Sequence, residues 1–163
     1  MIAPRVWAQT PPAGSQPAAP PSLEEMVAAQ RKKKGPPLEE SMVRDLVAYA
    51  HSDLEKVKAI IGQQPKIVNC VFDWGGGDYE TALGAASHMG RRDIALHLLA
   101  NNARLDIFAA TMLGKLDIVK ASLAAFPDAL NTPGPHGIPL IKHAEMGGDE
   151  AKTVLEFLQT LVK

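Results

Sequence analysis

The chain repeats part of its own sequence, and this internal repeat is the feature that most restricts its fold. When the sequence is shifted by 62 positions, seven of the 24 residues in the range 46–69 meet an identical residue. These seven are Ala48, Leu54, Val57, Lys58, Ala59, Pro65 and Asn69. A shift of 24 positions places Gly90 on Gly114 and Asp93 on Asp117. Such repetition indicates small units that bury their apolar faces against neighbouring units.

Each unit follows one order of elements: a short Ala-rich helix, a turn, and a second helix with an apolar face. The turns are expected at Ser52, Gly90 and Gly114, because glycine adopts the left-handed backbone that ends a helix. The expected first helices are 82–89 and 107–113, and the expected second helices are 54–61, 93–100, 116–125 and 150–161. The four units span approximately 41–69, 70–102, 103–130 and 131–163. A core of Ala, Leu, Ile, Val and Met is expected, since only 5% of the residues are aromatic.

The second unit resembles the ankyrin repeat over most of the repeat's length. The matching positions are Thr81, Leu83, Ala85, Ala86, Gly90, Ile94, Leu98, Leu99 and Ala103. The chain departs from the family pattern at Ala82 and Gly84, where proline and histidine are usual. The resemblance implies an all-α, ankyrin-type solenoid of about four helix-turn-helix repeats with one or two short β-hairpin loops. It also predicts that helices 22–34 and 38–51 pack as an N-terminal cap.

The N-terminal 40 residues are expected to lie outside the repeats. Residues 1–21 contain six prolines, which predicts an extended, disordered tail. Residues 22–40 are interpreted as a short helix with a basic end and a linker, because Ser22 and Glu25 fit a capping box and Arg31–Lys34 end the segment. The first residues resemble the end of an export signal. The compartment stays open: a soluble chain is periplasmic if this is the remnant of a longer signal, and otherwise cytoplasmic.

Composition and motifs argue against several function classes. The formal net charge of −1 does not suggest nucleic-acid binding, and no apolar run is long enough to span a membrane. Cys70 is the only cysteine, so cysteine-based zinc sites are excluded. No two of the five histidines have the i,i+4 spacing of a helical metal site, so we interpret each as a packing or surface residue. We therefore expect no cofactor, no metal and no enzymatic activity; a metal-dependent enzyme is the weakest hypothesis.

The resemblance implies a protein-protein interaction module that acts as a monomer. Ankyrin-type proteins bind a partner through hairpin tips and the exposed side of the first helices. Carried onto this chain, those positions are Trp74, Asp78, Glu80, His88, Met89, Met112, Leu113 and Glu145. Trp74 is open to two interpretations, an interface anchor or a cover for the neighbouring core. The alternative function is an inhibitor or immunity-type subunit that shields a partner enzyme; the sequence does not name the partner.

Overall fold

The computed structural model describes residues 20–162. The predicted tail, residues 1–21, therefore lies outside the described residues except for Pro20 and Pro21. Residues 1–37 and 38–163 form two separate units, and each is described by itself.

The first unit contains helix α1 (Leu23–Lys34), which begins at the predicted capping box. The Ser22 hydroxyl accepts a hydrogen bond from the Glu25 backbone N–H at 3.2 Å, and the Glu25 carboxylate accepts one from the Ser22 N–H at 2.7 Å. The helix ends at Gly35, whose φ of 95° is a conformation that favours glycine. No residue of α1 is buried. That this helix packs as a cap stays a prediction, because α1 and the residues from 38 onward belong to separate units.

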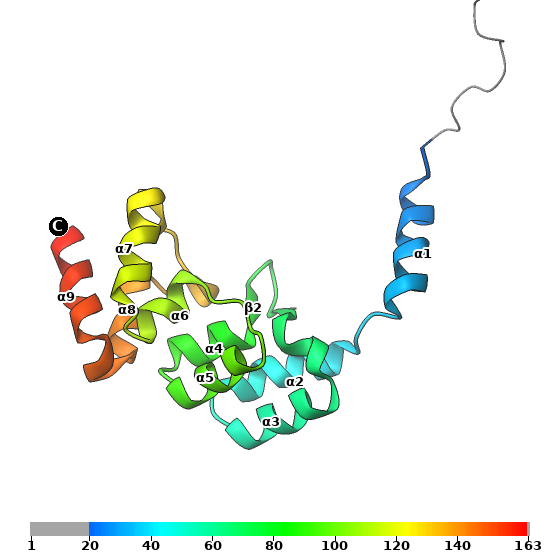
Figure 1. Cartoon of the computed structure of the whole chain (residues 1–163), viewed down its shortest axis with the longest axis horizontal. Coiled ribbons are helices and arrows are strands. Elements are labelled where there is room, and N and C mark those ends of the chain that lie inside the picture. The colour runs from blue at the N-terminus through cyan, green and yellow to red at the C-terminus, as the bar shows by residue number, and fades with distance from the viewer. Residues whose placement is uncertain (1–19, 163) are drawn as a thin grey trace, which may run out of the picture. The chain divides into compact units, whose positions relative to one another are not determined.

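The larger unit, residues 38–163, carries the remaining elements in chain order (Figure 1). Its helices are α2 (Glu40–Ala50), α3 (Leu54–Gln63), α4 (Ala82–His88), α5 (Arg92–Ala100), α6 (Ile107–Met112), α7 (Leu116–Ala125), α8 (Leu140–Met146) and α9 (Lys152–Leu161). Its strands are β1 (Val71–Asp73) and β2 (Tyr79–Thr81). Four short 3-10 helices are η1 (Pro65–Asn69), η2 (Pro127–Leu130), η3 (Pro135–Gly137) and η4 (Gly148–Ala151). Residues 20–162 are thus mostly helical. None of their helices is both long enough and apolar enough to cross a membrane.

Local sequence signals account for most of the helix boundaries. The Thr81 hydroxyl accepts a hydrogen bond from the Gly84 N–H at the start of α4, and the Asp106 carboxylate does the same for Ala109 in α6. Both predicted turn glycines have a positive φ, 65° at Gly90 and 70° at Gly114. The expected helix 116–125 is confirmed without change. The expected helix 150–161 is shorter, since residues 148–151 form η4 instead.

A single antiparallel hairpin, β1–β2, precedes α4, within the expected number of one or two. Val71 pairs with Thr81 and Asp73 with Tyr79. A glycine turn connects the strands: Gly75, Gly76 and Gly77 all have positive φ, and the Asp73 carboxylate accepts hydrogen bonds from the N–H groups of Gly75 and Gly77. Because side chains alternate along a strand, Phe72 and Glu80 point toward the helices while Val71 and Tyr79 face solvent.

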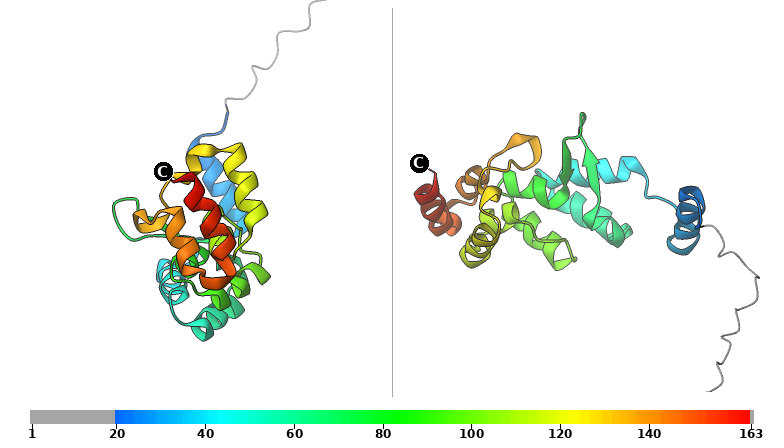
Figure 2. Two further views of the ribbon diagram at one scale, coloured as in Figure 1. Left: turned by 90° about the vertical axis from the view of Figure 1, so that its left-hand side faces the viewer. Right: turned by 90° about the horizontal axis from the view of Figure 1, so that it is seen from above.

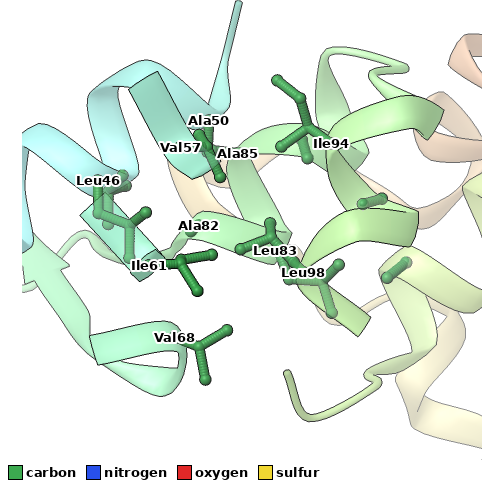
Figure 3. Packing of buried hydrophobic residues seen from close by; sticks show 14 of the residues in the cluster. Leu46, Ala50, Val57, Ile61, Val68, Ala82, Leu83, Ala85, Ile94 and Leu98 are labelled. Carbon is green, nitrogen blue, oxygen red and sulfur yellow. The ribbon is translucent and has the colours of Figure 1, made fainter. Parts of the chain in front are cut away.

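Helices α2, α4, α6 and α8 pack side by side, and each also packs against the helix that follows it. In Figures 1 and 2 these helix pairs follow one another in chain order. Small side chains allow the close approach: Ala82, Ala85 and Ala86 of α4 are fully buried. Ala85 lies in one cluster with Ala50 and Val57 from the preceding pair (Figure 3). A second cluster joins α6 and α7 to α8 and α9.

His143 of α8 is a buried titratable group in this second region. Its ring lies 4.9 Å from the Phe108 ring, and neither ring nitrogen has a hydrogen-bond partner. Burial, with a smaller effect from His88, lowers the pKa of His143 to about 4. The folded protein therefore binds fewer protons than the unfolded chain between pH 6.5 and 4.

We expect the free energy of unfolding to fall as the pH drops through this window, by about 3 kcal/mol at pH 4. Urea denaturation at several pH values would measure the loss. The difference between the wild type and His143→Leu isolates this group, because the other titrating groups cancel. Equal pH profiles for the two proteins would contradict the assignment.

Candidate metal centre

Four different segments of the chain bring three histidines and a glutamate together. His51 directly follows α2, Glu80 is the central residue of β2, His88 is the last residue of α4, and His136 lies in η3. One ligand atom from each residue can be chosen so that all four lie within 4.8 Å of one another. We call these four residues the His/Glu cluster.

The distances inside the cluster fit a tetrahedral metal site. Glu80 Oε1 lies 2.9 Å from His88 Nε2. Glu80 Oε2 lies 3.3 Å from His136 Nε2 and 3.6 Å from His51 Nε2. Zinc binds imidazole nitrogen and carboxylate oxygen at about 2.0–2.2 Å, so neighbouring ligands in a tetrahedron are about 3.4 Å apart. Small side-chain movements would therefore bring all four groups onto one ion.

Two of the histidines are held with Nε2 facing the cluster. His51 Nδ1 lies 3.0 Å from the carbonyl oxygen of Val47, and a carbonyl oxygen can only accept, so Nδ1 carries the proton. His136 Nδ1 lies 2.6 Å from Asp78 Oδ2. Hydrogen bonds of this kind fix the tautomer of metal-binding histidines and orient their rings. Both Nε2 atoms are thereby free to bind a metal.

Asp78 holds His136 by two hydrogen bonds. Besides the contact to Nδ1, Asp78 Oδ1 accepts a hydrogen bond from the His136 backbone N–H at 2.8 Å. Both hydrogen bonds lower the pKa of Asp78, and the one from the backbone N–H has the larger effect. Burial alone would lower the pKa of His136, but the hydrogen bond to Asp78 and the charge of Glu80 outweigh it, so this pKa is raised.

Glu80 is the buried centre of the cluster. Its side chain is 0% exposed and that of His88 only 8%, whereas His51 and His136 are 25% and 31% exposed. Trp74 Nε1–H donates a hydrogen bond to Glu80 Oε2 at 2.8 Å. Burial would raise the pKa of Glu80, but the hydrogen bonds from His88 and Trp74 outweigh this effect, and the pKa is lowered. Glu80 is therefore a buried negative charge that needs a positive partner.

The donor set indicates which ion would fit. Imidazole nitrogens suit zinc and the neighbouring divalent transition metals, whereas magnesium and calcium prefer sites made of oxygen. A dication would neutralise Glu80, and the three histidines would bind it as neutral ligands. Without an ion, the same residues form a network of close polar contacts around the Glu80 carboxylate.

The residues predicted to contact a partner lie in three different environments in the structure. Glu80 and His88 are cluster members, and Trp74 and Asp78 each bind one member. Met89 and Glu145 are exposed, as expected of contact residues. Met112 and Leu113 are buried, at 0% and 2% exposure, because α6 lies between neighbouring helices. Their expected exposure is wrong, and neither side chain is available to a partner.

The interpretation of all histidines as separate packing or surface residues does not hold for three of them. Ligand spacing of one helical turn does not identify His51 and His136 as candidate ligands. Here each ligand comes from a different segment, and 85 positions separate His51 from His136. The Gly134–Gly137 stretch around His136 signals only a turn.

Replacing Asp78 by asparagine is expected to weaken zinc binding by roughly 10- to 100-fold, the usual effect of removing an outer partner of a metal-binding histidine. The variant keeps the shape of the side chain but removes the charge that orients His136. Isothermal titration with zinc would measure the change. Asp73→Asn is the matched control, since Asp73 lies in the same hairpin and its carboxylate binds only backbone N–H groups of the turn. Equal losses in both variants would contradict a specific role for Asp78.

Comparisons with protein-family models, with curated proteins and with solved structures find no significant match to this chain. The resemblance to ankyrin repeats therefore depends on the sequence pattern described above.

Proposed function

We propose that this protein binds a divalent transition metal ion, with zinc the best fit, through His51, Glu80, His88 and His136. The observation that carries the proposal is the convergence of three imidazoles on a buried carboxylate, with ligand atoms within 4.8 Å of one another. The orientation of two rings by Val47 and Asp78 supports it, because a chance cluster has no need of fixed tautomers.

Titration of metal-free protein with zinc chloride tests the proposal. We expect one zinc ion per chain, and a cobalt-loaded sample should show the strong visible absorption of four-coordinate cobalt. His97→Ala is the control, because His97 is a histidine of α5 outside the cluster. Absence of zinc binding to the wild type would reject the proposal and leave the cluster as a hydrogen-bonded network.

We also propose that the pairs α2–α3, α4–α5, α6–α7 and α8–α9 are degenerate ankyrin-type units. The packing of α2, α4, α6 and α8 in chain order supports this assignment, as do the short turns inside three of the pairs. The metal centre then lies where ankyrin-type proteins carry their hairpin tips.

Protein binding is the second candidate function, and the outer face of the hairpin favours it. Val71 and Tyr79 leave 49% and 62% of their surface exposed on that face. Exposed apolar side chains beside one another are typical of contact sites. Captures from cell extract with the wild type and with Val71→Ser/Tyr79→Ser as baits would be compared. A protein that binds only the wild type, and does so again when purified, supports this function; identical captures reject this face.

A further inference from the structure

We infer that the bound ion is a structural cross-link that fastens the segment 131–139 to the hairpin and to α4. This inference rests on the proposed metal centre and adds what the ion does. Four protein side chains are enough to close the coordination shell of zinc, and closed four-ligand sites are typical of structural zinc. The ion would thus join parts of the chain rather than leave a position for a substrate.

The segment 131–139 needs such an anchor. None of its nine residues is buried. Two apolar neighbours of the segment are Gly84, which lies beside Pro135, and the Phe108 ring, which lies against Gly134. A segment with little buried surface opens at low free-energy cost.

The polar contacts between this segment and the hairpin all involve His136, among the hydrogen bonds and ion pairs of the described residues. They are the two hydrogen bonds to Asp78 and the contact to Glu80. The hydrogen bonds donated by the Gly134, Gly137 and Ile138 N–H groups stay within the segment. Those at its two ends, from Asn131 and Thr132 to Asp128 and from Lys142 to Pro139, join it only to its chain neighbours. An ion on His136 Nε2 would add one strong bond at the single residue through which the segment is held.

The cross-link makes a quantitative prediction, because zinc binding and opening of the segment are thermodynamically linked. Opening of the segment removes His136 from the ion and leaves three ligands, which is also the state of a His136→Ala variant. The factor by which saturating zinc lowers the equilibrium constant for opening must therefore equal the ratio of the zinc dissociation constants of the variant and the wild type. We expect a factor of at least about 10, because loss of one direct ligand should cost no less than loss of an outer partner.

Hydrogen exchange of the amides at 134 and 136–138, with and without zinc chloride, tests this inference, and calorimetry on the same samples gives the dissociation constants. Support requires slower exchange in zinc-loaded wild type by the predicted factor and no such slowing in His136→Ala. Helix α1, which carries no ligand, serves as the internal control for exchange chemistry.

The outcomes separate the cross-link from the metal centre. If zinc binds the wild type but exchange in 134–138 does not change, the cross-link is wrong and the metal centre stands. If zinc does not bind the wild type, both are wrong. If His136→Ala fails to fold, hydrogen exchange in zinc-loaded and zinc-free wild type still tests the cross-link: slower exchange at 134–138 with zinc supports it, and unchanged exchange contradicts it.

Discussion

Substituting Glu80 by glutamine is expected to lower the affinity for zinc at least about 100-fold. The amide has nearly the same shape as the carboxylate but no charge, and it is a poor ligand for zinc. It also leaves the ion in a buried position without its anionic partner, which costs more than the same loss at the surface. At a zinc concentration 100 times the wild-type dissociation constant, the wild type should gain about 2.7 kcal/mol of stability. Glu80→Gln should gain less than half of this.

Urea denaturation with and without zinc chloride would measure both gains. Glu145→Gln is the matched control, because it makes the same chemical change on the exposed surface of α8, where Glu145 pairs with Lys142. This control should keep the full zinc effect. A Glu80→Gln protein that zinc stabilises as much as the wild type would show that Glu80 is no ligand.

Replacing Gly114 by alanine is expected to destabilise the fold by about 2–5 kcal/mol. Gly114 has a φ of 70°, which costs about 1–2 kcal/mol for a residue with a Cβ atom. The added methyl group would also collide with the backbone carbonyl of Glu150, because the turn between α6 and α7 packs against η4. Backbone cannot move aside as a flexible side chain can, and overpacking typically adds about 1–3 kcal/mol.

Gly148→Ala separates the two causes. Gly148 has a similar φ of 61°, but nothing lies within 4 Å of an added Cβ atom. It should therefore lose only the conformational part, about 1–2 kcal/mol. Free energies of unfolding from urea denaturation would give both values. Equal losses in the two variants would mean that the contact between Gly114 and Glu150 does not restrict the turn.

The sequence by itself determined much of the local structure. The capping box at Ser22 and the glycine turns at Gly90 and Gly114 were predicted and are confirmed. Each depends on residues within a few positions of one another, because capping bonds and backbone conformation act over that range. The repeat also predicted that helices come in consecutive pairs. The sequence pattern did not predict which side chains of the first helices are buried. Met112 and Leu113 stand at repeat positions that are usually exposed, but neighbouring helices cover them.

Only the tertiary structure decided the candidate metal centre. His51, Glu80, His88 and His136 lie on four segments, and no spacing along the chain shows that their side chains meet. Whether Nε2 of a histidine is free depends on the hydrogen bond that the other nitrogen makes, here to the Val47 carbonyl oxygen in the preceding helix and to the Asp78 carboxylate in a hairpin distant from His136. Helix pairing follows from local periodicity, whereas a ligand set requires several packed units to place side chains within a few ångströms. That placement is a property of the packed core, so the sequence predicted the helices and left three of the four ligands as apparently unrelated histidines.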